Sequence, residues 1–168
     1  MTPLVSIIMG STSDLPVMEK ACKWLDEHCI PFEVNALSAH RTPDAVEEFA
    51  RNAQGRGVKV IIAAAGMAAA LPGVIAASTS LPVIGVPIKG MLDGLDALLS
   101  IVQMPPGIPV ATMGVNGAMN AAILAAQIIA LGDPEVAKRV AEYKSTLGQK
   151  IEKANKELAE IKYDYKTN

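Results

Sequence analysis

Two short segments near the start of the chain contain residue types that can bind a phosphate and transfer a proton. Gly10–Asp14 (GSTSD) and Ser38–Pro43 (SAHRTP) each follow an apolar run typical of a strand and precede a segment typical of a helix. The carboxyl ends of parallel strands meet at one edge of a sheet, where α/β proteins bind small phosphorylated ligands. We therefore expect one site, in which hydroxyls, N–H groups and a guanidinium bind an anion while an imidazole moves a proton.

The first segment, Gly10–Asp14, is compatible with two roles. Ser and Asp are favourable helix N-caps, because their side chains accept hydrogen bonds from N–H groups that a helix leaves free. The same N-terminal N–H groups also bind anions. The segment is neither a Walker loop nor a GxGxxG motif, which favours a single phosphate over a nucleoside triphosphate or a dinucleotide. Asp14 would suit a ribose hydroxyl, since a carboxylate accepts hydrogen bonds.

The second segment, Ser38–Pro43, is more specific. His40 and Arg41 could be two solvated residues of a turn. Alternatively, Ser38 and Arg41 hold a phosphate while His40 acts as general acid and base, which an imidazole can do near neutral pH. The chain has one other histidine, His28, near the predicted end of the first helix. There we expect a surface cation that interacts favourably with the helix dipole.

A third segment, Ala63–Gly73 (AAAGMAAALPG), follows the third apolar run. Its small side chains let the backbone approach a ligand, or they only permit tight packing of a helix against the sheet. The two histidines and two cysteines are not spaced as metal ligands, so we expect no metal.

Apolar runs and helical patterns alternate along the first 131 residues. Strands are predicted at 4–9, 32–37, 58–65, 82–86 and 109–113, and helices at 15–28, 43–56, 71–78, 94–103 and 118–131. This order predicts an α/β protein with a three-layer parallel sheet and right-handed crossovers. Among doubly wound folds we prefer the flavodoxin-like strand order.

From Pro134 to about residue 162, apolar residues recur mostly at spacings of three and four, with Lys and Glu between them. This pattern predicts a long C-terminal amphipathic helix. The helix could pack on its own domain or on a neighbouring subunit. We favour the neighbouring subunit, because the five-strand unit is already complete before the helix begins.

Length and composition indicate a single domain over residues 1–168, with a core at about 1–133 and the helix at about 134–162. The net charge of -2 and the lack of a basic cluster argue against nucleic acid as a partner. Charged residues make up 19% of the chain, against about 25% in typical domains, which favours a homo-oligomer over an alanine-rich core alone. The absence of a signal-peptide pattern or membrane-length apolar run, and two unpaired cysteines, predict a cytoplasmic protein without a membrane partner.

Together these segments resemble the class I N5-carboxyaminoimidazole ribonucleotide mutases of bacterial purine biosynthesis. The matching segments are Gly10–Asp14, Ser38–Pro43, Ala65–Gly66, Leu71–Gly73 and Leu98–Pro105. The resemblance implies an isomerase that moves a carboxylate from an exocyclic nitrogen to ring carbon C4 of an aminoimidazole ribonucleotide. It also implies a homo-octamer of flavodoxin-like subunits, with sites formed between subunits and with no metal or organic cofactor.

The resemblance also assigns roles by position. His40 would be the general acid and base, and Asp14 would bind the ribose. The substrate phosphate and its adjoining groups would be bound by Ser11, Ser13, Ser38 and Arg41. The remaining substrate-binding residues, near the base and carboxylate, would be Ala39, Ala65, Gly66 and Leu71. Two positions depart from the usual pattern: Ala70 stands where many members have histidine, and Met67 replaces a usual glycine. His40 would therefore act without a second imidazole.

Two rival interpretations remain. The related carboxylases use aminoimidazole ribonucleotide and carbon dioxide directly, but they usually carry lysine within the segment that here reads Arg41–Pro43. A non-catalytic flavodoxin-like module is the other rival. A flavin-binding module usually stacks aromatic residues on the ring, and this chain has one Trp, two Phe and three Tyr. A phosphoryl-receiver module needs acidic residues at strand ends, where this chain has Gly10, Ser38 and Ala65.

Overall fold

The computed structural model describes residues 1–168 and contains a five-stranded, all-parallel sheet. The strands are β1 (Val5–Met9), β2 (Phe32–Ala36), β3 (Val60–Gly66), β4 (Val83–Ile88) and β5 (Ala111–Thr112). Their order across the sheet is β2-β1-β3-β4-β5, which is the flavodoxin-like order. The predicted fold class is therefore confirmed.

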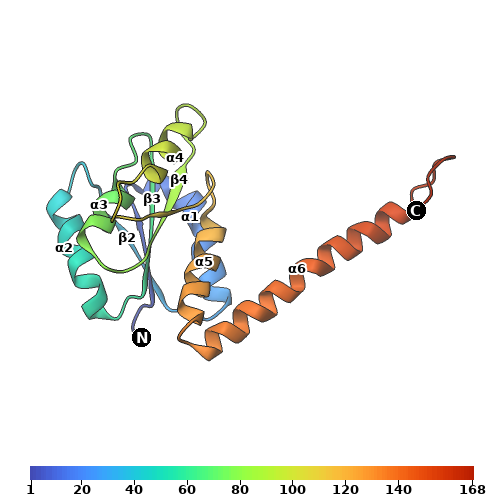
Figure 1. The fold of residues 1–168 in the computed structure, drawn as a ribbon, viewed down its shortest axis with the longest axis horizontal. Helices are drawn as coiled ribbons and strands as arrows, with labels where there is room; N and C mark the ends of the chain where they lie inside the picture. The colour runs from blue at the N-terminus through green and yellow to red at the C-terminus, as the bar shows by residue number, and fades with distance from the viewer.

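Helices cover both faces of the sheet (Figure 1). On one face lie α1 (Leu15–Glu27) and α5 (Ala118–Ala130), and on the other lie α2 (Pro43–Ala53), α3 (Leu71–Ser78) and α4 (Leu95–Val102). Two short 3₁₀ turns, Thr12–Asp14 and Gln54–Arg56, precede α1 and follow α2. Gly57 ends the second turn with φ of 96°, a left-handed conformation that glycine adopts without a steric penalty.

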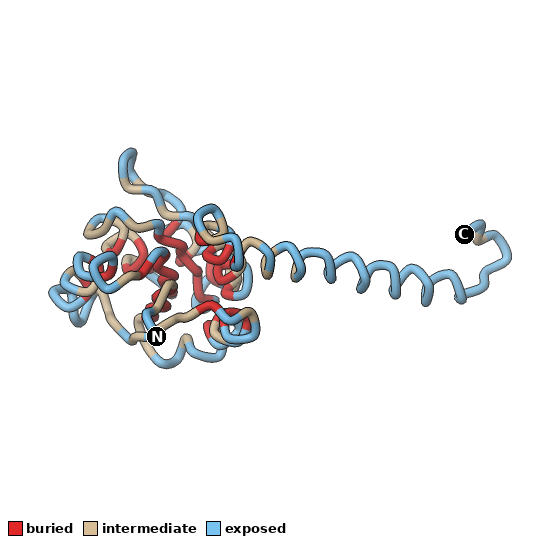
Figure 2. Tube along the Cα trace, turned by 90° about the horizontal axis from the view of Figure 1, so that it is seen from below, coloured by how far each residue is buried: buried red, intermediate tan, exposed pale blue.

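The core lies on both sides of the sheet, because alternate residues of each central strand point to opposite faces. Val5 and Ile7 of β1 pack with α1 and α5, whereas Ile8 packs in the cluster that contains α2 and α3. All five residues of β1 are buried, as Figure 2 shows for the centre of the domain. Burial on both faces explains why the central strands are continuous apolar runs rather than alternating ones.

All five strands differ by one or two residues at their ends from the sequence prediction, and the differences in β4 and β5 bear on the site and on the sheet edge. β4 continues to Ile88, where Gly66 of β3 pairs with it, although the prediction ended at residue 86. β5 contains only Ala111 and Thr112, although a strand over 109–113 was predicted. Proline at position 109 has no N–H to give to the ladder, and β5 is an edge strand with one neighbour, so little pairing remains there.

The sheet register places the loops predicted to form the site side by side. Met9, near the end of β1, pairs with Ala36 of β2 and with Ala64 of β3, and Ala64 in turn pairs with Val86 of β4. The four strands therefore end at nearly the same level. The segments that follow them all open at one edge of the sheet.

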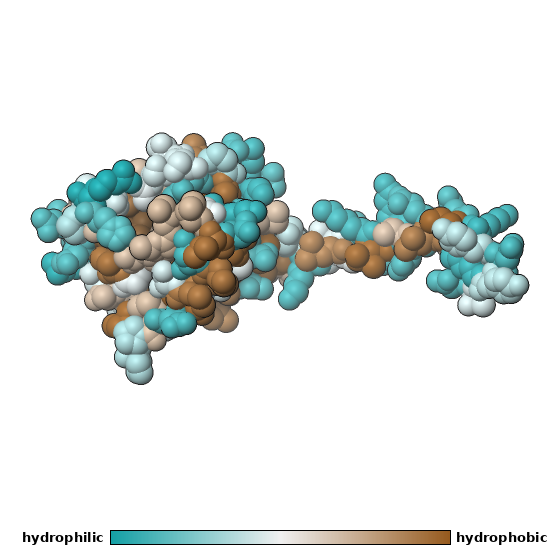
Figure 3. Space-filling view, turned by 90° about the horizontal axis from the view of Figure 1, so that it is seen from above, coloured by the Kyte–Doolittle hydropathy of each residue, from teal (hydrophilic) through white to brown (hydrophobic).

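The last helix, α6 (Pro134–Glu160), leaves the domain (Figure 1). It starts after Asp133, whose Oδ1 accepts hydrogen bonds from the N–H groups of Glu135 (3.0 Å) and Val136 (3.2 Å). Val136 is its only buried residue, and most of the helix lies in solvent (Figure 2). Figure 3 shows a line of hydrophobic side chains along it. None of the helices in the fold combines the length and apolar character needed to cross a membrane.

His28 lies at the C-terminal end of α1, as expected, and its partly exposed ring packs against neighbouring side chains. Its Nδ1 lies 2.7 Å from the carbonyl oxygen of Trp24, and its ring stacks on the Trp24 ring with centroids 4.0 Å apart. Tyr143 of α6 meets both rings edge-on. The apolar part of the imidazole thus packs between the end of α1 and the start of α6. Cys22 and Cys29 are both free thiols, as expected.

Candidate active site

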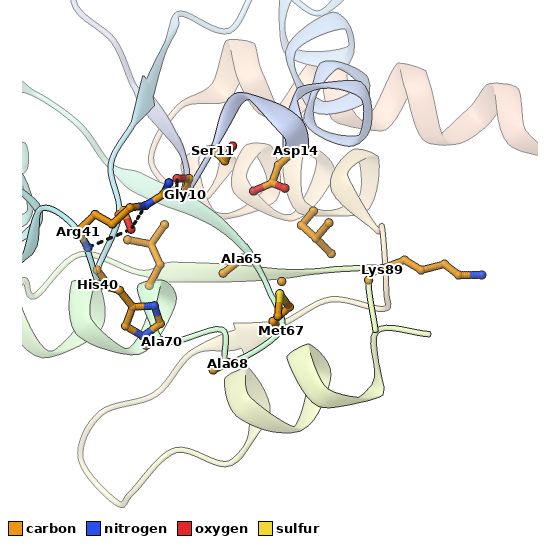
Figure 4. A pocket seen from close by; sticks show the side chains of 16 residues that line it. Gly10, Ser11, Asp14, His40, Arg41, Ala65, Met67, Ala68, Ala70 and Lys89 are labelled. Atoms are coloured by element: carbon orange, nitrogen blue, oxygen red, sulfur yellow. Dashed lines mark hydrogen bonds between the residues drawn. The ribbon is translucent and has the colours of Figure 1, made fainter. Parts of the chain in front are cut away.

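A cavity of about 320 Å³ opens at the carboxyl edge of the sheet (Figure 4). Four segments supply its walls: residues 10–14 after β1, 38–41 after β2, 65–71 at the end of β3 and 88–90 at the end of β4. Three of the segments follow or complete the central strands β1, β3 and β4, and residues 38–41 follow the edge strand β2. The position agrees with the rule that open α/β sheets bind ligands beyond the carboxyl ends of their strands.

The structure places nearly all of the residues predicted for the site around this cavity. Ser13 is the exception among them. Its Oγ donates to Oδ1 of Asp14 at 3.3 Å, and its N–H donates to Oγ of Ser11 at 3.3 Å, so it supports two residues that line the cavity. The predicted residues that line it are Ser11, Asp14, Ser38, Ala39, His40, Arg41, Ala65, Gly66 and Leu71.

Arg41 joins the first two loops. Its Nη2 donates to the carbonyl oxygen of Gly10 at 2.9 Å, and its Nε donates to Oγ of Ser38 at 3.3 Å. Its backbone N–H also donates to that Ser38 oxygen, at 3.2 Å. None of the ion pairs in the structure involves Arg41. A guanidinium that is oriented but has no counter-ion favours an incoming anion.

The turn that carries His40 is closed by Ser38 and Thr42. The N–H of Ser38 donates to Oγ1 of Thr42 at 3.0 Å, and the Thr42 hydroxyl donates back to the Ser38 carbonyl at 3.1 Å. Pro43 then starts α2, where its missing N–H costs nothing. The exposed imidazole of His40 is left at the cavity wall, in contrast to His28, whose ring is engaged by the fold.

Asp14 is half-buried, and in Figure 4 it lies on the other side of Gly10 from Arg41. Burial raises the pKa of its carboxyl above the ordinary value, and the hydrogen bond from Ser13 partly offsets this effect. The side chain makes no capping hydrogen bond to α1, although it stands at the N-cap position. A partly desolvated acceptor of this kind gains from a ligand hydroxyl.

The rest of the wall is made of small or apolar residues. Ala65, Gly66 and Leu71 lie on one side with Ala68 and Ala70, and Ile88 lies near them. Such a surface can contact a flat or neutral group.

Sequence reasoning missed the last segment of the wall, Ile88–Gly90. The Lys89 N–H donates to Oδ1 of Asn116 at 2.9 Å, and its ammonium pairs with Asp93 at 3.0 Å, pointing away from the cavity in Figure 4. The available signal was the fourth predicted strand, because whatever follows it must open at the same edge as the first three loops.

No group of three or more His, Cys, Asp or Glu side chains is placed to hold a metal ion.

Comparison with known proteins identifies the family. The AIR carboxylase family matches residues 4–150, which is most of the chain. The chain belongs to the AIR carboxylase family. One member of similar sequence is the N5-carboxyaminoimidazole ribonucleotide mutase of Thermotoga maritima, 54% identical over 162 residues that cover 96% of this chain and 95% of the relative.

Two further proteins are similar to this chain. A phosphoribosylaminoimidazole carboxylase of Candida glabrata is 50% identical over 96% of this chain, but the match covers only 29% of that longer protein. The crystal structure of PurE from Treponema denticola superimposes with a TM-score of 0.84 at 33% identity, covering 93% of this chain and 98% of that one.

Proposed function

We propose that this chain is a mutase that converts N5-carboxyaminoimidazole ribonucleotide to 4-carboxy-5-aminoimidazole ribonucleotide in de novo purine biosynthesis. The similarity to the Thermotoga maritima mutase over nearly the full length of both proteins supports this proposal. The observation that carries it is the cavity itself, which joins an unpaired guanidinium, a half-buried carboxylate, a free imidazole and an apolar wall.

In this proposal the residues of the two loops bind different parts of the substrate. Arg41, Ser38 and Ser11 bind the phosphate, together with N–H groups at the start of the first 3₁₀ turn. Asp14 accepts hydrogen bonds from the ribose. The aminoimidazole ring then lies between His40 and the alanine-rich wall.

The chemistry needs one proton-transfer group. When the carbamate N–C bond breaks, carbon dioxide leaves, the electron pair stays on the exocyclic nitrogen, and this nitrogen takes a proton from the His40 imidazolium. Ring carbon C4 then attacks the carbon dioxide, and the proton on C4 passes to the neutral His40 imidazole. Atoms and charge balance, and the histidine returns to its starting form. The wall around Ala65 and Ala70 keeps carbon dioxide near C4, which raises its effective concentration.

Purified protein should convert the N5-carboxylated substrate to the C4-carboxylated isomer without ATP. His40→Asn should bind substrate with unchanged affinity in titration calorimetry but lose turnover by about 10²- to 10⁴-fold, the usual contribution of a positioned acid–base group. His28→Asn is the matched control, because it removes the chain's only other imidazole, and it should keep its turnover.

Turnover of His40→Asn near that of the wild type would reject the acid–base role. Product formed faster from aminoimidazole ribonucleotide and bicarbonate than from the N5-carboxylated substrate would favour the carboxylase alternative.

We also propose that the active enzyme is a cytoplasmic homo-octamer that needs no cofactor, nucleic acid or membrane. Three features support the oligomer: the exposed apolar residues of α6, the apolar α4 surface at Leu95 and Leu99, and a cavity open on one side. The two free thiols are consistent with a reducing compartment.

A further inference from the structure

Thr42 stands at the N-cap of α2, but its hydroxyl does not cap the helix. The Thr42 carbonyl oxygen accepts a helical hydrogen bond from the Val46 N–H at 3.1 Å, as expected of an N-cap residue. A threonine side chain at this position usually accepts a further hydrogen bond from an N–H group of the first turn. In α2 the side chain makes no such bond. The helix therefore lacks a stabilising contact that this residue type can provide.

The polar N-cap residues of this chain differ according to their distance from the site. Asp133, at the N-cap of α6, does not line the cavity, and its carboxylate accepts hydrogen bonds from the N–H groups of Glu135 and Val136. Asp14, at the N-cap of α1, lines the cavity and makes no capping hydrogen bond. Thr42 directly follows the cavity residue Arg41 and makes none either. Departures from a local rule of this kind concentrate at functional sites.

The Thr42 hydroxyl is directed back to Ser38 instead. Its Oγ1 accepts a hydrogen bond from the Ser38 N–H at 3.0 Å and donates one to the Ser38 carbonyl oxygen at 3.1 Å. The Thr42 N–H donates to the same carbonyl at 2.8 Å. Removal of the hydroxyl would break two of these three hydrogen bonds. The hydroxyl thus helps to hold the turn that contains Ala39, His40 and Arg41.

His40 depends on this turn more than Arg41 does. The Arg41 guanidinium has hydrogen bonds that do not involve Thr42, to the carbonyl of Gly10 at 2.9 Å and to Oγ of Ser38 at 3.3 Å. Dashed lines join Arg41 to its neighbours in Figure 4, and none reaches the His40 ring, which is exposed. The position of the imidazole is therefore set by the backbone of the turn.

We propose that Thr42 is a positioning residue for proton transfer: its hydroxyl closes the turn that holds the His40 imidazole beside the substrate ring, instead of capping α2. This inference rests on the proposed mutase function. Thr42 does not line the cavity, so it acts through His40 and touches no reacting atom. A displacement of about 1 Å can lower the rate of a positioned group by about 10²-fold, so a looser turn should reduce turnover more than substrate binding.

The test separates turnover from binding in the intact chain. Thr42→Val keeps the shape of the side chain and removes the hydroxyl. Its kcat for conversion of the N5-carboxylated substrate should fall about tenfold or more, because His40 is less well placed. The dissociation constant of the C4-carboxylated product, measured by titration calorimetry, should change by less than about threefold, because Arg41 keeps its own hydrogen bonds. Thr42→Ser retains the hydroxyl and should restore most of the turnover.

Thr79→Val is the matched control. The Thr79 hydroxyl closes another turn, where Oγ1 accepts a hydrogen bond from the Leu81 N–H at 3.2 Å. Thr79 follows α3 at the opposite end from the cavity residue Leu71. The substitution removes the same kind of hydrogen bond and should leave kcat unchanged. Circular dichroism should show both valine variants folded at the assay temperature.

A wild-type kcat in Thr42→Val would overturn the proposal, as would a loss confined to affinity. Thr42→Ser as slow as Thr42→Val would also overturn it, because the hydroxyl would not be the group that matters. An equal loss of turnover in Thr79→Val, or unfolding of Thr42→Val at the assay temperature, would contradict it by assigning the effect to stability. A wild-type protein that forms no C4-carboxylated product would instead overturn the proposed function.

Discussion

At the scale of single residues, the two histidines show how position decides the use of one side-chain type. His28 ends α1, and its ring is held by a 2.7 Å contact with a carbonyl and by stacking on Trp24. His40 sits in a turn closed by its neighbours, so its ring remains accessible at the cavity. The first serves packing, and the second is available for proton transfer.

At the same scale, partial burial of the Asp14 carboxylate lowers the stability of the folded protein at neutral pH. Its pKa is raised by burial in the folded protein, so its protonated form favours folding. That contribution is fully present below the unfolded-state pKa and is lost as the pH rises through the folded-state pKa. At neutral pH the charged carboxylate therefore opposes folding, and it makes no capping hydrogen bond that would compensate.

Asp14→Asn should consequently unfold at the same or a higher temperature than the wild type at pH 7, while binding substrate more weakly. The difference in melting temperature should shrink toward pH 4, as the wild-type carboxyl becomes neutral. Asp44→Asn, at the exposed first turn of α2, is the control and should be slightly destabilising at pH 7, because it loses a favourable charge at a helix N-terminus. A lower melting temperature for Asp14→Asn at pH 7 would contradict this account.

At the scale of elements, close packing of helices on the sheet positions residues that form the cavity wall. Gly85 of β4 pairs with Ala63 on one side and Thr112 on the other. A Cβ at this position would overlap the Ile101 side chain of α4 and stand 3.1 Å from Cγ1 of Val110. The side chains that cover β4 therefore rest directly on its backbone. The same layer includes α3, whose first residue, Leu71, lines the cavity.

Gly85→Ala should lower the free energy of unfolding by about 1–3 kcal/mol, the usual cost of overpacking a core. Urea denaturation followed by circular dichroism measures it. Gly55→Ala is the matched control, since a Cβ there meets no atom within 4 Å, and it should be neutral or slightly stabilising. Equal stability of the two variants would show that β4 can move away from α4 without cost.

At the scale of the whole molecule, the projecting helix α6 leaves apolar side chains exposed to solvent. Ile151 is 65% exposed and Leu158 is 54% exposed, on the same side of the helix as Leu147. A monomer gains little from holding such residues in water, whereas burial of each fully exposed side chain against a second copy is worth about 1.5–3 kcal/mol. The apolar side of α6 thus favours association.

Replacing Ile151 and Leu158 together by Glu should reduce the proposed octamer to smaller species in light scattering. Turnover should fall with it, because the proposed sites are shared between subunits. Lys156→Glu changes an exposed residue on the opposite side of α6 and should leave the molar mass unchanged. An octamer that survives the double substitution would mean that α6 does not hold the subunits together.

Local chemistry along the chain was sufficient to predict the alternation of strands and helices, the start of α2 at Pro43, and the bounds of α3 at residues 71–78. These features depend on neighbouring residues, through backbone preference and hydrophobic period. The loops at the strand ends followed from the same reasoning, because parallel strands must all open at one edge.

Only the tertiary structure revealed the stacking of His28 on Trp24, the place of Lys89 and Gly90 in the cavity, and the left-handed backbone of Met67. It also showed that α6 projects away from the α/β core, the one of two placements that the sequence analysis favoured without deciding it. These features depend on strand register and on packing between segments far apart in the chain. Local preferences cannot encode them, because the free energy that decides them arises only when those segments meet.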